Sequence, residues 1–115
     1  MEHLGSIEAG FDFVIKSMKC LSPGGIAVHT TEFNLSSNDD TLDGWPTCIY
    51  RKQDIDRFAE RISDLGHEIY PLNYFSGTDA LDTHIDYPPH APPHLKIALE
   101  QFVSTSIGFA IRKAS

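Results

Sequence analysis

Side chains that could ligate a metal gather in a proline-rich stretch of the chain. His84, Asp86, His90 and His94 lie two to four residues apart. Imidazole nitrogens and carboxylate oxygens are zinc ligands, so this spacing is compatible with a small metal-dependent hydrolase. The spacing matches no established zinc motif, and the neighbouring prolines make the segment stiff. The sequence therefore predicts no metal site, although hydrolysis stays open as one alternative.

Other candidates have the chemistry of acid–base catalysis and substrate binding. Glu32 could act as a general base, and His84 or His90 could orient an acceptor, because carboxylates and imidazoles reach useful pKa values with modest tuning. Trp45 offers a ring for stacking, and a lid over the local core is the alternative. All of these residues are also typical of solvated loops. The residues expected to line a substrate are Phe33, Asn34, Trp45 and Asp86.

Two amphipathic helices are predicted from apolar residues at helical spacing. The first runs from Ser6 to about Leu21, where Ser6 can cap the first turn and the Pro23-Gly24-Gly25 turn stops the helix. The second runs from Ile55 to Leu65 and is ended by Gly66. The apolar positions are Ile7, Phe11, Val14, Ile15, Met18 and Leu21 in the first helix, and Ile55, Phe58, Ala59, Ile62 and Leu65 in the second.

Three strands are predicted around these helices. Residues 25–33 are apolar on both faces over their first half, as in a strand that helices cover on both sides. Residues 67–74 form a further strand, in which Pro71 cannot donate to a ladder and therefore indicates an edge position or a bulge; an edge position fits the end of a sheet. Residues 102–112 form the last strand, while residues 94–101 could be a helical turn or another strand. Residues 34–46 and 76–93 are expected to be loops without a core of their own.

This order of elements predicts one α/β domain over residues 1–115. The crossover rule makes the first two strands parallel neighbours in one sheet. Ligands of such sheets gather outside the carboxyl ends of the strands, so residues 32–34 and 79–94 are expected to share one rim. His29, inside the first strand, is expected to be a hydrogen-bonded core histidine.

Composition narrows the classes of partner. The net charge of -7 and the pI near 5.1 argue against nucleic acid or anionic membrane as a direct partner, because such surfaces are basic. No apolar run is long enough for a spanning helix, and the N-terminus has no signal-peptide pattern, so we expect a cytoplasmic protein. Cys20 and Cys48 have neither zinc nor disulfide spacing and are expected to be structural thiols.

One segment resembles a known family. Glu2-His3-Leu4 precedes the first helix, and Cys20-Leu21-Ser22-Pro23-Gly24-Gly25 leads into the first strand. This arrangement resembles class I, Rossmann-like S-adenosylmethionine-dependent methyltransferases from just after the fourth strand through the fifth, where a Leu-x-Pro-Gly-Gly turn commonly precedes strand five. The later helix and strands are similar to the rest of that fold, through strands six and seven. The resemblance covers nearly the whole chain.

The resemblance also implies what this chain lacks. Intact members bind S-adenosylmethionine with a glycine-rich turn after strand one and an acidic residue after strand two. None of the eight glycines forms a G-x-G pattern, so no cofactor is expected for this chain alone. Glu2 and His3 correspond to the loop that borders the cofactor, with a frayed N-terminus as the alternative. The methyl acceptor, whether a small molecule or another class, is not identified by these residues.

Three functions follow as alternatives. The first is the C-terminal part of a methyltransferase that is inactive alone, the second is the hydrolase, and the third is a non-catalytic interaction module. If strand four is missing, the strand over residues 25–33 keeps one unpaired edge. Exposed edges recruit other chains, so we expect a homo-oligomer.

Overall fold

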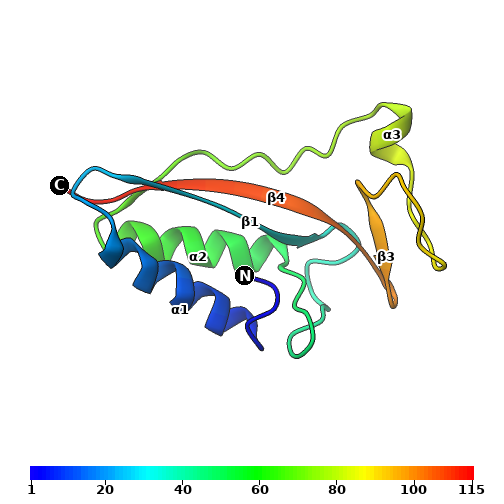
Figure 1. Cartoon of the computed structure of the whole chain (residues 1–115), viewed down its shortest axis with the longest axis horizontal. Coiled ribbons are helices and arrows are strands. Elements are labelled where there is room, and N and C mark those ends of the chain that lie inside the picture. Colours follow the sequence, from blue (N-terminus) through cyan, green and yellow to red (C-terminus); the bar gives the residue numbers. More distant parts are fainter.

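The structure is a computed structural model that describes residues 1–115. Its helices and strands are drawn in Figure 1, with both long helices beneath the sheet. In chain order they are α1 (Ile7–Ser17), the 3-10 helix η1 (Met18–Cys20), β1 (Ile26–Asn34), α2 (Lys52–Asp64), β2 (Glu68–Ile69), α3 (Ala80–Thr83), β3 (Ile97–Leu99) and β4 (Phe102–Arg112). The chain is thus a mixed α/β fold, and none of its helices has the length and apolarity needed to cross a membrane.

The sheet is built around β4. This strand pairs with β1 over nine residues, and on its other edge it pairs with β2 and, further along, with β3. Every pairing is antiparallel. The prediction that the first two strands are neighbours is therefore wrong, because β4 lies between them. The ladder of β2 ends at Ile69, close to Pro71, whereas β4 offers β1 a long partner without a proline.

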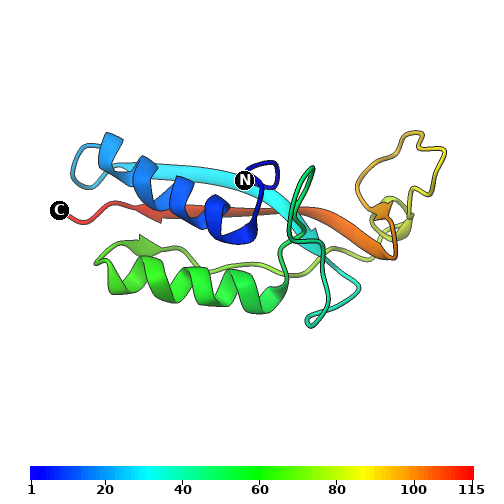
Figure 2. The same cartoon turned by 90° about the horizontal axis from the view of Figure 1, so that it is seen from below.

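Both long helices cover the same face of the sheet, as the two views show together (Figures 1 and 2). The opposite face is open, with Ile26 47% and Val28 72% exposed. The prediction of a strand covered on both sides is therefore wrong. Alternate residues of β1 face opposite ways, and only one set meets the helices. The buried core between sheet and helices consists of Ile7, Phe11, Val14, Met18, Phe33, Cys48, Tyr50, Ile55, Phe58, Ile62, Ile107, Phe109 and Ile111.

The start and end of the first helix follow the sequence closely. The Ser6 side chain accepts the Ala9 amide at 3.0 Å, which confirms the predicted N-cap. The last predicted turn is the 3-10 helix η1, so the α-helix itself ends at Ser17. Gly24 then has φ +74, a conformation that favours glycine and turns the chain into β1.

The second helix begins three residues before its predicted start. Asp54 caps this helix, because its Oδ2 accepts the Arg51 amide at 3.0 Å. The Arg51 guanidinium also contacts this buried carboxylate, with Nε at 2.7 Å from Oδ2. A cap formed by Arg and Asp was missed because Ser and Thr are the usual signals.

The remaining predictions were confirmed in part. The last strand is Phe102–Arg112, as predicted, and the undecided stretch forms β3. The edge strand after Gly66 shortens to two residues, β2, and the rest of the predicted strand forms no ladder. The short helix α3 was not predicted; its cap is Asp79, whose amide donates to Asp82 at 3.1 Å.

Candidate functional site

Three of the predicted site residues meet at one cavity. His3, Glu32 and Trp45 come from the N-terminal segment, the end of β1 and the loop before α2. The cavity has a volume of about 450 Å³, within the range of small-molecule pockets. Its other lining residues are Pro46, Thr47, Ile97 and Leu99. The lining is thus mostly apolar, with one carboxylate and one imidazole.

The N-terminal segment is tied down beside this cavity. His3 Nδ1 lies 3.0 Å from the Pro46 carbonyl oxygen, and the Cys48 amide donates to the Glu2 carbonyl at 2.8 Å. The Glu2 carboxylate accepts from the N-terminal ammonium at 3.0 Å and from the Thr31 hydroxyl at 3.2 Å. Partial burial opposes ionisation of Glu2, but its own amide, the ammonium and the Thr31 hydroxyl together keep its pKa below the ordinary value. This segment is therefore ordered.

Glu32 is the acidic group of the cavity. Its carboxylate accepts the Ser104 hydroxyl at 2.7 Å, and its backbone carbonyl accepts the Tyr50 amide at 2.9 Å. The second carboxylate oxygen has no protein partner and can accept a proton or a hydrogen bond from a ligand. Trp45 is 79% exposed, so its ring is free to stack on a ligand and does not cover a core.

Two other predicted lining residues lie outside this cavity. Phe33 is buried and packs against Tyr74, with ring centroids 5.4 Å apart, beside a second cavity. The Asn34 side chain is buried and holds the following loop. It accepts the Ser36 and Ser37 amides at 2.9 Å and donates to the Asp40 carbonyl at 3.1 Å. Both polar atoms of the Asn34 side chain are therefore engaged within the protein.

The histidine-rich loop forms a separate cluster around Asp86. This carboxylate is 4% exposed and accepts the Ala91 amide at 3.0 Å. His94 Nδ1 lies 2.6 Å and His90 Nδ1 3.4 Å from the same oxygen, Oδ2. The Ala91 amide, helped by the two imidazoles, holds the pKa of Asp86 below its usual range. His84 lies outside the cluster and is exposed.

The arrangement of the Asp86 cluster tests the alternative of a metal-dependent hydrolase. No group of three or more His, Cys, Asp or Glu side chains is arranged to hold a metal ion. The side chains of the Asp86 cluster do not line the cavity at Glu32, although the Asp86 backbone pairs with Ile97, which does. Of the loop over residues 79–94, only Asp82 joins a cavity with Phe33.

His29 differs from its prediction. Its Nε2 atom is buried and has no hydrogen-bond partner, so the expected hydrogen-bonded histidine is wrong for this atom. The ring stacks on Phe109 at 5.6 Å and meets Phe13 edge-on at 6.4 Å. Burial, helped by the nearby N-terminal ammonium, lowers the pKa of His29.

The second cavity contains residues that the sequence did not suggest. It has a volume of about 390 Å³ between β4 and residues 73–77, and Lys96 is its one basic side chain. No motif marks Lys96, which lies in an irregular stretch before β3. Lys96 lines this cavity only because three segments that are distant in the sequence fold together.

Comparison of the chain with protein-family models, with curated proteins and with solved structures found no match. Any function must therefore be inferred from the residues of the chain itself.

Proposed function

We propose that this chain is the C-terminal part of a class I methyltransferase domain, and that His3, Glu32 and Trp45 border its acceptor site. The observation that carries the proposal is the position of β4 beside β1. Residues 25–33 resemble strand five, which in that family lies between strand four and the final strand. β4 is the final strand of this chain and pairs with all nine residues of β1. Helices α1 and α2 on one face agree with the same arrangement.

The outer edge of β1 supports the proposal independently. Tyr50 bonds to the Glu32 carbonyl and the Asn34 amide from the side opposite β4. Because backbone groups alternate along an antiparallel strand, Val28 and Thr30 also point their amide and carbonyl groups to that side, where no segment meets them. A preceding strand four would pair with these groups. Residues 47–50 cover only the end of the edge.

The residues present do not form a site for S-adenosylmethionine. The Glu2 carboxylate is bonded to the N-terminal ammonium and Thr31, and His3 contacts the Pro46 carbonyl. Neither side chain is arranged around a nucleoside, and the chain has no glycine-rich turn. We therefore assign the chain only the acceptor side: Trp45 stacks, His3 orients, and Glu32 can take a proton from the acceptor.

The test compares this chain with the protein encoded when the same reading frame is extended upstream of Met1. We expect the extended protein to bind S-adenosylmethionine with a micromolar Kd by titration calorimetry, and the 115-residue chain to show no binding. In the extended protein, Glu32→Gln should lower methyl transfer more than cofactor binding, and Lys19→Met, on exposed η1, is the matched control. Upstream codons that encode no strands, or micromolar binding by the short chain, would overturn the proposal.

The proposal includes a homo-oligomer, because the outer edge of β1 has unpaired backbone groups. Light scattering of the chain alone should give a mass above 12.8 kDa at high concentration, because β1 can pair with a second copy. Val28→Lys should weaken this assembly if the open face takes part, provided that circular dichroism shows a folded variant. A folded monomer at high concentration would contradict the pairing of β1 edges.

A further inference from the structure

The edge of β4 that faces away from β1 is paired only at its two ends. The Ala110 carbonyl accepts the Tyr70 amide at 3.0 Å, and Ser104 pairs with Ile97 of β3. Between these points Ser106 and Gly108 have the same backbone orientation as Ala110, yet no hydrogen bond reaches them. Both residues are exposed. Their four amide and carbonyl groups are therefore free to pair with another extended segment.

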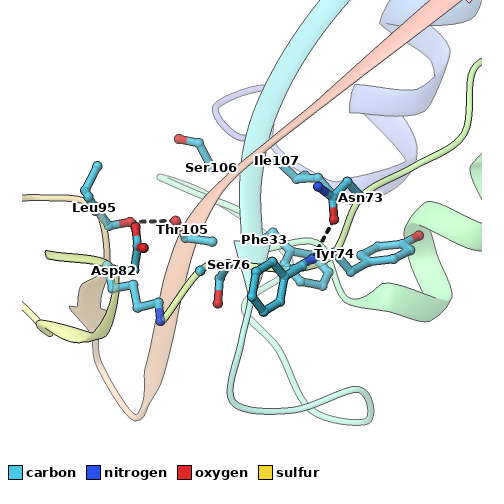
Figure 3. A pocket seen from close by; sticks show the side chains of 12 residues that line it. Phe33, Asn73, Tyr74, Ser76, Asp82, Leu95, Thr105, Ser106 and Ile107 are labelled. Atoms are coloured by element: carbon cyan, nitrogen blue, oxygen red, sulfur yellow. Dashed lines mark hydrogen bonds between the residues drawn. The ribbon is translucent and has the colours of Figure 1, made fainter. Parts of the chain in front are cut away.

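A cavity lies against this free edge. Ser106 of β4 and Tyr74, both labelled in Figure 3, line this cavity, and Phe75 lines it next to Tyr74. Phe75 is 73% exposed, and the ring of Tyr74 packs on Phe33. The cavity thus combines a row of backbone hydrogen-bonding groups with an aromatic wall. These two features together are typical of sites that bind a peptide by strand addition.

The charged groups of the cavity are Lys96 and Asp82. Asp82 caps α3 by accepting the Asp79 amide, whereas Lys96 forms no salt bridge with any carboxylate. Lys96 lines the cavity and directly follows Leu95, whose carbonyl accepts the Thr105 hydroxyl at 2.5 Å, so its backbone lies beside the start of the free edge. An unpaired ammonium at one end of a free strand edge provides a partner for an anionic group.

The free edge is too short for a strand to pass through. It is closed at one end by the bond between Tyr70 and Ala110, and at the other by the contact between Thr105 and Leu95. The end of a peptide chain can therefore pair with this edge, whereas a strand that continues in both directions cannot. We propose that this cavity binds the C-terminal end of an extended peptide, which pairs with Ser106 and Gly108 and places its terminal carboxylate at Lys96.

The direction and chemistry of the peptide follow. Its carboxylate lies near Thr105, at the start of β4, so the peptide runs antiparallel to this strand. One of its side chains packs on Tyr74 and Phe75 and is therefore apolar. The net charge of -7 disfavours further acidic groups, so its remaining side chains are neutral or basic.

The probe is the fluorescein-labelled tetrapeptide Lys-Val-Thr-Val, compared as its free acid and its C-terminal amide by fluorescence anisotropy. We expect saturable binding of the acid and about tenfold weaker binding of the amide, because a charge-assisted contact is lost. Lys96→Met should weaken binding of the free-acid peptide until it equals binding of the amide. Asp82→Asn should strengthen binding of the free-acid peptide, because a nearby negative charge is removed. Lys19→Met, at the opposite end of β4, is the control.

A second measurement tests the pairing itself. In the free protein the Ser106 and Gly108 amides should exchange with solvent faster than the Ile107 amide, which faces β1, and the acid should protect both. A peptide N-methylated at the valine before threonine should bind more weakly. Equal binding of acid and amide, unchanged exchange at Ser106 and Gly108, or benzoate competing as well as the peptide would each overturn the proposal.

Discussion

The helix-covered body and the distal segment, residues 75–99, are held together by different forces. The body consists of α1, α2, β1, β2 and β4, and its core includes Phe11, Phe58 and Tyr50 with no exposed surface. The distal segment buries only Asp86 and Ala98. Its contacts are polar, since Asp86 alone bonds to Ala91 and His94 through its side chain and to Lys96 and Ala98 through its backbone.

The difference shows how each region responds to change. Many residues pack together in the apolar core, so a substitution at one core position lowers the free energy of unfolding of the whole body. The hydrogen bonds around the buried Asp86 carboxylate stabilise only its own loop, so they can open without unfolding the body.

Removing a central core ring should give the largest effect. Phe58 stacks on Phe11 at 4.8 Å and meets Phe109 at 5.4 Å, so Phe58→Ala should lower the free energy of unfolding by about 3–5 kcal/mol. The measurement is urea unfolding followed by circular dichroism. Phe75→Ala, in the distal segment, is the control and should have little effect. Equal losses from the two variants would contradict the contrast between the regions.

A glycine in the body should be nearly as sensitive. A Cβ atom at Gly10 would lie 1.8 Å from the Tyr50 hydroxyl oxygen, so Gly10→Ala should cost about 1–3 kcal/mol of stability. Tyr50→Phe removes that oxygen, which otherwise makes only a 3.5 Å contact with the Ile7 carbonyl. The double variant should therefore recover part of the loss, measured as a coupling free energy. Simple additivity would contradict the close approach.

His29 should make the body sensitive to pH. Its pKa is lowered in the folded state, so the unfolded chain binds more protons as the pH falls through the ordinary histidine value near 6.5. Stability should therefore decrease between about pH 7 and pH 5. His29→Phe should add about 1 kcal/mol by removing the unpaired Nε2 and should weaken this pH dependence. The exposed His84→Gln variant should retain it, and urea titrations at both pH values provide the measurement.

Asp86 should affect only the distal segment. Because its pKa is lowered in the folded state, its contribution is complete above the ordinary aspartate value near 4 and is lost as the pH falls through the lower folded value. Asp86→Asn should speed hydrogen exchange of the Ala91 amide at pH 7 while the global unfolding transition changes little. Asp40→Asn, on an exposed loop, is the control. A large loss of global stability would show that the two regions unfold together.

Much of the local structure could be predicted from single stretches of sequence. Apolar residues at helical spacing predicted α1 and α2, Ser6 and Gly24 marked the ends of α1, and the apolar run after Gln101 predicted β4. Such signals are carried by residues within one or two turns of each other. The caps formed by Arg51 and Asp54 and by Asp79 and Asp82 were less visible, because these pairs are weaker sequence signals.

The order of the strands and the composition of the sites depend on contacts between distant parts of the chain. The pairing of β1 with β4 joins residues that are 70 or more positions apart, and it depends on which of several strands offers the longest uninterrupted ladder. His3, Glu32 and Trp45 were all predicted as candidates, but their meeting at one cavity follows from that pairing. Lys96 and the free edge at Ser106 had no local signal. The Ser106 backbone groups stay unpaired because the segment that follows β2 does not continue along β4. No single stretch of sequence contains that information.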